Sequence, residues 1–290
     1  MTNVLKIENL HLSFRGYTGT SKVLHGISLS IKKGERVALV GESGSGKSVT
    51  ARVILGLLQE LRTSKIKGAL EFNGQNLNTM HSSDWQALRG TDMSMIFQDP
   101  TSSLNPVFTI GDQFVEVLRR RTPKLEIKAA LVRAAELLVS VSINDHERVL
   151  NAFPFQLSGG MNQRVVIAMA LANKPALLIA DEPGTALDVT VQAQTLRLMQ
   201  DLTEQSGTSV LFISHNLGVV REFADRVYVI YRGNIVESGP TKTIFEKPGH
   251  AYTQALMSAV PRLTGGGIPE IEDDRVAFLA PSVFHDEVGP

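Results

Sequence analysis

The chain has 290 residues, 43% of them hydrophobic, which is enough to bury a full core and argues against disorder as its main state. Lys plus Arg equals Asp plus Glu at 29 each, so no net charge draws the whole surface to nucleic acid. Cysteine is absent, which excludes disulfides, thiolate metal sites and iron–sulfur ligation by this chain and favours a reducing compartment.

The first third of the chain predicts short strands, turns and one helix. Residues 1–14 alternate apolar and polar side chains as a strand does, without the basic start and unbroken apolar run of a signal peptide. Around a helix predicted at 46–58, the predicted strands are 5–10, 27–31, 36–40, 69–72 and 94–97. Apolar runs elsewhere fall short of the roughly 18 residues that cross a bilayer, so any role at a membrane is expected to be peripheral.

A helical stretch follows at residues 109–141 and is interrupted at Pro123. Apolar residues of its second segment recur at helical spacing and predict one buried face, formed by Ile127, Leu131, Ala135 and Leu138. Because strand patterns precede this stretch and resume after it, we expect a helical insertion.

From residue 157 onward helices and strands alternate, which predicts a parallel sheet wrapped by helices. The predicted helices are 160–172 and 191–205, and the predicted strands are 176–180 and 209–213. Strands at 227–231 and 234–237 are expected to form a hairpin across Arg232 and Gly233. After a glycine-rich joint that begins at Gly265, the tail has no predicted element.

Residues 41–48, GESGSGKS, match the pattern GxxxxGK[ST] between a predicted strand and a predicted helix. Backbone N–H groups of such a loop surround phosphates at a helix N-terminus, and glycines are needed because a Cβ would block the approach. Lys47 is expected to reach the β- and γ-phosphates, and the Ser48 hydroxyl to bind Mg²⁺. The alternative, an ordinary glycine turn, is disfavoured by the strand before the loop and the helix after it.

Two adjacent carboxylates follow the apolar run at 177–180. Asp181 is expected to hold Mg²⁺ through water, and Glu182 to polarise the attacking water as general base. Taken alone, such a pair is more often a solvated strand end or a helix cap. The phosphate loop upstream favours the catalytic interpretation.

Residues 157–164, LSGGMNQR, resemble the signature motif of ATP-binding cassette (ABC) proteins. Ser158 and the amides of Gly159 and Gly160, at the start of a helix, would form a second anion site, although Ser-Gly-Gly can also simply cap a helix. In the family this site binds the γ-phosphate held by the other subunit's phosphate loop. The resemblance therefore implies two ATP molecules sandwiched in a head-to-tail dimer. Met161 stands where Gln is commonest in the family, and Met is frequent there among peptide importers.

Further family elements occur in the expected order. Gln98 resembles the loop glutamine that touches Mg²⁺ and the water and senses the transmembrane partner. Asp188 ends a segment similar to the loop that links the two sites across the dimer, and His215 resembles the switch histidine that contacts the γ-phosphate. Phe14 lies where the family stacks an aromatic ring on adenine, with Tyr17 as a weaker candidate. Each residue alone would usually be structural, and it is their order that favours function.

The phosphate loop and the resemblance together define three sets of candidate residues. The catalytic candidates are Glu182, His215 and Gln98, and the candidate metal ligands are Ser48, Gln98 and Asp181. The residues expected to bind nucleotide are Phe14, Gly41, Glu42, Ser43, Gly44, Ser45, Gly46, Lys47, Ser48, Val49, Ser158, Gly159, Gly160 and Asp188.

The resemblance covers about residues 1–262, and two stretches narrow it to the oligopeptide, dipeptide and nickel importer branch. They are FQDPTSSLNP at 97–106 and PGHAYTQALMSAVP at 248–261. Within the second stretch, His250 and Tyr252 could indicate a metal or substrate site. Packing at a helix start is the favoured interpretation, because convergent metal ligands are not visible in the sequence.

Besides Met161, the chain departs from the family pattern at three points. It has no cysteine-rich iron–sulfur segment, which some members of the branch carry after the C-terminal stretch. Asn216 replaces the acidic residue that often follows the switch histidine, and Thr185 precedes the linking loop where Ser is usual. None of these departures removes a catalytic group.

The resemblance implies an α/β fold with a P-loop NTPase (RecA-like) core, an N-terminal antiparallel β subdomain, an inserted α-helical subdomain and a short C-terminal extension. The expected domains are an ABC nucleotide-binding domain at 1–240, with the helical subdomain at about 99–157, and an extension of the oligopeptide-importer type at 241–290.

The function implied is transport-coupled hydrolysis of ATP with Mg²⁺, driving uptake of a small solute, above all di- or oligopeptides. The expected partners are a second ABC ATPase subunit, commonly a paralogue, two transmembrane permease subunits and, indirectly, a periplasmic or lipid-anchored substrate-binding protein, with no nucleic acid. The expected location is the cytoplasmic face of the bacterial plasma (inner) membrane. The alternatives are an importer for nickel, opine or oligosaccharide, an exporter component, a soluble ABC ATPase of DNA repair, ribosome function or cofactor assembly, and a structural module without ATPase activity.

Overall fold

The computed structural model describes residues 2–17, 19–59, 61–184, 189–258 and 281–285, without the side chains of residues 101 and 189–191. The chain divides into two compact units. Unit 1 comprises residues 1–2, 32–34 and 80–210, and unit 2 comprises residues 3–31, 35–79 and 211–290. The boundary between them falls within strand β8 (Ser209–Ile213).

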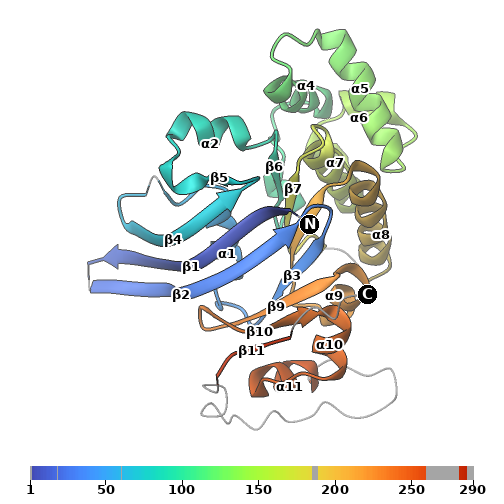
Figure 1. Cartoon of the computed structure of the whole chain (residues 1–290). Helices are drawn as coiled ribbons and strands as arrows, with labels where there is room; N and C mark the ends of the chain where they lie inside the picture. The colour runs from blue at the N-terminus through green and yellow to red at the C-terminus, as the bar shows by residue number, and fades with distance from the viewer. Residues whose placement is uncertain (1, 18, 60, 185–188, 259–280, 286–290) are drawn as a thin grey trace. The chain divides into compact units, whose positions relative to one another are not determined.

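An antiparallel sheet of four strands forms one part of unit 2, in the order β2-β1-β4-β5 (Figure 1). Its strands are β1 (Asn3–Gly16), β2 (Gly19–Lys32), β4 (Ser64–Phe72) and β5 (Gln75–Asn76). Leu5 lies opposite Phe72 and Ile7 opposite Leu70, so the buried side chains of β1 and β4 share one face. The strands run well beyond the predicted 5–10, 27–31 and 69–72, because their outer parts are polar and lack an alternating apolar signal.

The other strands of unit 2 are β3 (Arg36–Val40), β9 (Arg226–Tyr231), β10 (Asn234–Pro240) and β11 (Val283–Phe284). β3 pairs with β9 in parallel, β9 with β10 antiparallel, and β10 with β11 in parallel. The hairpin predicted across Arg232 and Gly233 is confirmed, and both residues have the positive φ, 45° and 76°, that a tight hairpin turn requires. The helices of this unit are α1 (Lys47–Ile54), η1 (Leu77–Thr79), α9 (Leu217–Phe223), α10 (Thr241–Glu246) and α11 (Ala251–Ser258).

Unit 1 combines parallel strands with helices. β6 (Met93–Ile96) pairs in parallel with β7 (Leu177–Asp181), and every residue of β7 is buried. The helices are α2 (Ser82–Leu88), α3 (Pro100–Ser103), α4 (Ile110–Arg121), α5 (Ile127–Ser140), α6 (His146–Asn151), η2 (Pro154–Gln156), α7 (Gly159–Leu171) and α8 (Val189–Ser206). The sequence pattern missed α2 and α3, which are short and polar.

The helical stretch predicted at 109–141 is confirmed, since α4 and α5 occupy residues 110–121 and 127–140. Thr109 caps α4, its Oγ1 accepting the N–H of Asp112 at 3.2 Å while the Asp112 carboxylate accepts the N–H of Thr109. The helical pattern breaks around Pro123, between α4 and α5.

The buried face predicted for α5 is right at Leu138 and wrong at Ile127. Ile127 is 55% exposed, and the fully buried positions are Ala130, Ala134 and Leu138. Ala130 packs with Leu118 of α4 in one core cluster. Small side chains let neighbouring helices approach closely, so a stripe of alanine packs inward although its hydrophobic signal is weaker than that of Ile and Leu. In the described part of the chain, no helix combines the length and apolarity needed to span a membrane.

Candidate active site

The phosphate loop at residues 41–48 joins the end of β3 to the start of α1 in unit 2. Gly41, Gly44 and Gly46 have positive φ angles of 153°, 78° and 112°. A Cβ on Gly41 would lie 2.1 Å from the carbonyl oxygen of Ile230, and one on Gly46 would lie 2.8 Å from Leu24 Cδ2. The loop therefore needs glycine at both positions for its own packing, independently of any ligand.

The start of α1 has the features of an anion site. Its N-cap is Gly46, which has no side chain to accept the first N–H groups of the helix. Ser45 Oγ is buried and has no hydrogen-bond partner among the described residues. An orphaned buried hydroxyl beside uncapped helix amides fits a bound phosphate group, whose oxygens would accept from both.

Lys47 is 6% exposed, and its ammonium group lies within the loop. Nζ donates to the carbonyl oxygens of Gly41 and Glu42, each at 2.7 Å. A buried ammonium is stable only where acceptors or anions compensate its lost hydration. The phosphate loop therefore holds a positive charge at the place where the sequence predicts a triphosphate.

In unit 1, two predicted catalytic residues lie together at the ends of neighbouring strands. Ile96 of β6 lies opposite Ala180 of β7 in parallel register, so Gln98 and Glu182 both follow two residues later. Gln98 Nε2 donates to Glu182 Oε2 at 3.1 Å. The hydrogen bond holds the Glu182 carboxylate in one orientation. The oxygen of the Gln98 amide lies on the side of the amide group away from this bond.

Glu182 has φ 51°, in the left-handed region that residues other than glycine rarely adopt. Its carbonyl oxygen accepts the N–H of Gly184 at 2.7 Å, which closes a tight turn after β7. Asp181, the last residue of β7, is buried. The two carboxylates therefore have different environments, one in the strand and the other in the turn.

The candidate metal ligands Ser48, Gln98 and Asp181 offer hydroxyl, amide and carboxylate oxygens, the donor set that Mg²⁺ prefers. These residues fit a hard cation rather than zinc or copper. The described residues contain no cluster of three or more His, Cys, Asp or Glu side chains that would hold a metal on their own.

Ser158 is the N-cap of α7, and its Oγ accepts the N–H of Met161 at 3.3 Å. Ser158 therefore caps the helix, as in the alternative that the sequence left open beside an anion site. Ser158 and Gly159 are exposed, whereas the next residues of the helix enter the core, with the Asn162 amide donating to Pro154 O at 3.0 Å. The positive end of a 13-residue helix therefore faces solvent on a rigid support.

The remaining predicted residues lie at the following places. His215 is exposed and follows β8, and Phe14 is half-buried on β1, opposite Ser64. Asn216, the departure from the family pattern, caps α9 by accepting the N–H groups of Gly218 and Val219 at 3.1 and 3.4 Å. Asp188, predicted in the linking loop, lies outside the described residues.

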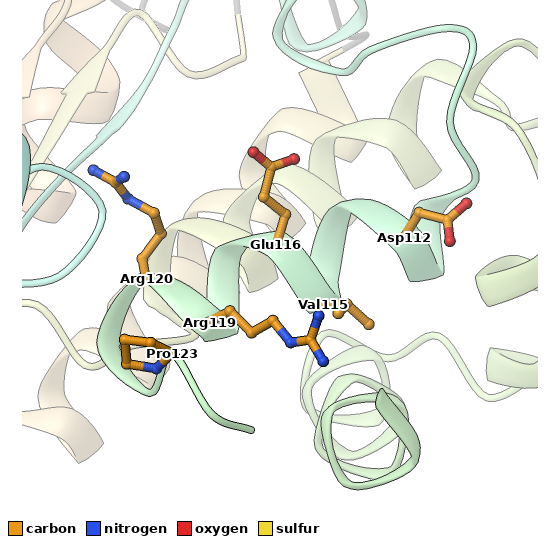
Figure 2. Close-up of a pocket in the computed structure, with 6 residues that line it drawn as sticks. All are labelled: Asp112, Val115, Glu116, Arg119, Arg120 and Pro123. Carbon is orange, nitrogen blue, oxygen red and sulfur yellow. The ribbon is translucent and has the colours of Figure 1, made fainter. Parts of the chain in front are cut away.

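One hollow of unit 1 lies along α4, away from the predicted site residues of this unit. It is lined by Asp112, Val115, Glu116, Arg119, Arg120 and Pro123 (Figure 2). Arg119 Nε donates to the carbonyl oxygen of Leu125 at 2.9 Å, so this guanidinium is engaged with its own connection. None of the residues predicted to bind nucleotide lines the hollow, and it is not the candidate site.

Sequence reasoning missed one contact of the phosphate loop. Tyr252 of α11 is buried, and its hydroxyl accepts the N–H of Glu42 at 2.9 Å. The packing interpretation for His250 is confirmed, because its Nδ1 accepts the N–H of Tyr252 at 3.1 Å at the start of α11. Tyr252 lies in a motif that the sequence shows, but its partner Glu42 is 210 positions away in the sequence, so no local pattern indicates the contact.

Comparison with known proteins identifies two matching segments. The family model described as "ABC transporter" matches residues 24–185. A second model, "Oligopeptide/dipeptide transporter, C-terminal region", matches residues 236–279. The second segment includes most of β10, the second strand of the hairpin, together with α10 and α11.

Curated relatives match along most of the chain. The oligopeptide transport ATP-binding protein OppD of Bacillus subtilis (strain 168) is 47% identical over 271 residues, which are 93% of this chain and 75% of that protein. The dipeptide transport ATP-binding protein DppD of Lactococcus lactis subsp. cremoris (strain MG1363) is 47% identical over 259 residues, 89% of this chain and 74% of that protein. Among solved structures, the dimeric ATP-binding cassette MJ0796, in a post-hydrolysis state with ADP and Pi, gives a TM-score of 0.72 at 28% identity, covering 82% of this chain and 98% of that chain.

Proposed function

Since this chain belongs to the ABC transporter family, we propose that it is the ATP-hydrolysing subunit of an importer that takes up di- or oligopeptides. The expected cassette fold is confirmed by the similarity to MJ0796, and ATPase activity follows from the family. The substrate class belongs to the proposal.

One observation favours a peptide importer over a soluble cassette enzyme. The same chain contains a phosphate loop and a C-terminal segment that matches the oligopeptide/dipeptide transporter model at 236–279. Its relatives OppD and DppD are named for transport of oligopeptides and dipeptides. A soluble cassette enzyme would not need a C-terminal segment of the transporter type.

In the proposed reaction the phosphate loop binds the triphosphate of ATP. Lys47 donates to the β- and γ-phosphates while it stays beside the carbonyl oxygens of Gly41 and Glu42, and the amides of the first turn of α1 donate to the phosphate oxygens. Ser45 Oγ gains the partner that it lacks among the described residues. Phe14 is assigned to the adenine ring by stacking.

Glu182 acts as general base toward the attacking water. The hydrogen bond from Gln98 Nε2 orients its carboxylate, so that one oxygen is held and the other is directed to the water. His215 donates to the γ-phosphate, and Asp188 connects the two sites of the dimer. Mg²⁺, when bound by Ser48, Asp181 and Gln98, neutralises charge on the phosphate oxygens.

The second half of each nucleotide site is the exposed cap of α7 from a partner cassette. Ser158, Gly159 and Gly160 present a helix N-terminus to solvent, where the γ-phosphate of a nucleotide held by the partner would complete it. ATP then favours the closed pair, since it binds that state better than the open one. The partner cassette is a paralogue in this proposal.

The helical insertion, about residues 99–157, docks on the permease. Its surface carries apolar side chains that a lone soluble domain would normally bury: Val107 is 71% exposed, Phe108 49% and Phe155 71%. The chain accordingly sits at the cytoplasmic face of the plasma membrane, on two permease subunits that a substrate-binding protein serves. In domain terms, residues 1–240 form the nucleotide-binding domain and 241–290 the C-terminal extension.

Uptake in cells tests this function. In a strain whose chromosomal copy carries Glu182→Gln, uptake of radiolabelled di- and oligopeptides should fall to background, whereas Glu246→Gln, an exposed residue of α10 outside the helical insertion, should leave uptake unchanged. Loss of nickel or oligosaccharide uptake with normal peptide uptake would reject the peptide assignment. Normal uptake of every solute would reject a transport function.

A further inference from the structure

The peptide group between Gly41 and Glu42 is hydrogen-bonded on both sides. Its carbonyl oxygen, that of Gly41, accepts from Lys47 Nζ at 2.7 Å. Its N–H, that of Glu42, donates to the phenol oxygen of Tyr252 at 2.9 Å. One rigid peptide plane therefore connects the C-terminal segment to the lysine that the phosphate loop uses.

Tyr252 is itself held firmly. It is 2% exposed, and its ring lies 4.3 Å, centroid to centroid, from the ring of Tyr231 at the end of β9. Its N–H donates to His250 Nδ1, and the N–H of His250 donates to the buried carboxylate of Glu237 at 3.0 Å. Burial raises the pKa of Tyr252 to about 12, so the phenol keeps its proton throughout the physiological range.

The loop is also supported from the hairpin of unit 2. The N–H of Gly233 donates to the carbonyl oxygen of Ser45 at 2.9 Å, and the backbone of Ile230 packs against Gly41. These contacts hold the backbone of the loop at Gly41 and Ser45. The hydroxyl of Tyr252 adds a contact at the second residue, next to the carbonyl oxygens that hold Lys47.

We infer that Tyr252 is a positioning residue for ATP binding: its phenol oxygen fixes the Gly41–Glu42 peptide and thereby places the Lys47 ammonium for the triphosphate. The C-terminal segment then contributes to nucleotide affinity as well as to its own packing. This inference rests on the proposed function, because it requires that the loop binds ATP. Loss of the hydrogen bond from Glu42 N–H to Tyr252 should weaken ATP binding without slowing the chemical step, because this peptide group touches no reacting atom.

The test compares two buried phenols of unit 2. Tyr252→Phe keeps the ring and removes the acceptor of the Glu42 N–H. Tyr228→Phe is the matched control, because the Tyr228 hydroxyl accepts the N–H of Ser30 at 3.1 Å, on another strand. For the full chain, Tyr252→Phe should raise the ATP Kd and the KM about 3- to 10-fold, the size of one hydrogen bond, with kcat within about 2-fold. Tyr228→Phe should leave all three unchanged.

A double-mutant cycle separates positioning from general packing. Glu42→Pro deletes the N–H donor, and Glu42→Ala removes the same carboxylate while retaining the N–H. Adding Tyr252→Phe should weaken ATP binding in the Glu42→Ala chain but have no further effect in the Glu42→Pro chain. Equal effects in both backgrounds, or an unchanged Kd in Tyr252→Phe, would overturn the inference.

A third variant distinguishes failure of the inference from failure of the proposed function. Lys47→Ala should abolish measurable ATP binding, since the triphosphate loses its main cation. If Lys47→Ala binds ATP as tightly as the natural chain, the phosphate-loop assignment fails and the positioning role fails with it. If Lys47→Ala loses ATP while Tyr252→Phe binds normally, only the role of Tyr252 is rejected.

Discussion

Glu182 is constrained by its backbone as well as by a neighbouring side chain. A left-handed φ of 51° costs a residue other than glycine about 1–2 kcal/mol. Its carboxylate also accepts from Gln98 at 3.1 Å. Strained conformations persist only where the surrounding structure enforces them, and they are concentrated at functional sites. The strain at Glu182 therefore supports the assignment of the general base independently of the sequence motif.

Replacing Glu182 by Gln tests that assignment. The substitution keeps the size of the side chain and the backbone strain but removes the charge that polarises water. We expect MgATP binding to be retained and phosphate release under saturating MgATP to fall about 10²-fold or more. Glu136→Gln should hydrolyse at the normal rate. Normal turnover in Glu182→Gln would exclude this carboxylate as the base.

Most site residues could be predicted because their chemistry is local in sequence. The phosphate loop lies within eight residues, 41–48, and its glycines have the positive φ that the motif implies. The pairing of Gln98 with Glu182 follows once β6 and β7 are known to be parallel neighbours. The contact of Tyr252 with Glu42 could not be predicted, because no local pattern indicates which backbone N–H a distant phenol will meet.

At the scale of elements, Glu237 of β10 organises the C-terminal segment. Its side chain is 0% exposed and accepts the N–H of Gly249 at 2.7 Å, the N–H of His250 at 3.0 Å and His285 Nε2 at 2.5 Å. Glu237 also lies opposite Val283 in the pairing of β10 with β11 (Figure 1). One carboxylate therefore connects the start of α11 and the end of β11 to the same strand.

This arrangement predicts a pH-dependent stability. Burial acts to raise the pKa of Glu237, but the hydrogen bonds that it accepts outweigh burial and lower the pKa below the ordinary value of 4.5. A carboxylate with a lowered pKa stabilises the fold fully above its unfolded-state pKa, and that stabilisation is lost as the pH falls through the folded-state pKa. The contribution of Glu237 is thus present at neutral pH and disappears in acid.

Glu237→Gln should therefore lower the free energy of unfolding at neutral pH by about 1–3 kcal/mol, the cost of a buried donor that loses its acceptor. Its Tm should approach that of the natural chain as the pH is lowered from about 5 toward 3. Thermal melts across that range measure both effects. Glu246→Gln, an exposed residue of α10, should follow the natural chain at every pH. A constant difference in Tm between Glu237→Gln and the natural chain would contradict the prediction.

The elements that the sequence predicted well are those with strong periodicity or strong turn residues. β3, β8 and the hairpin after β9 are of this kind. The pattern failed where packing rather than hydrophobicity decides: α5 buries alanines and leaves Ile127 exposed. It also failed for α2 and α3, since helices of 7 and 4 residues are too short to show a period.

At the scale of the whole molecule, the account depends on a site that one chain cannot complete. In the proposed dimer, the lysine loop of one cassette binds the triphosphate, and the exposed helix cap of the other, Ser158 in this chain, closes over it. A sequence can indicate such a site only through a family resemblance, because the contact joins two chains. Ser158 and Gly159 are exposed on a helix that is otherwise largely buried, as the surface of such a composite site would be.

The natural absence of cysteine makes this site directly measurable. In the transporter complex purified through this chain, Glu182→Gln and the matching substitution of the base in the partner cassette prevent hydrolysis, and Ser158→Cys introduces a thiol at the cap of α7 of a chain that otherwise has no cysteine. The account predicts that MgATP slows maleimide labelling of that thiol about 10-fold or more, as expected for a group buried in a closed interface. The thiol of Ser83→Cys, exposed on α2 and outside the helical insertion, should be labelled equally with and without MgATP. Equal labelling of Ser158→Cys in the presence and absence of MgATP would contradict the composite site.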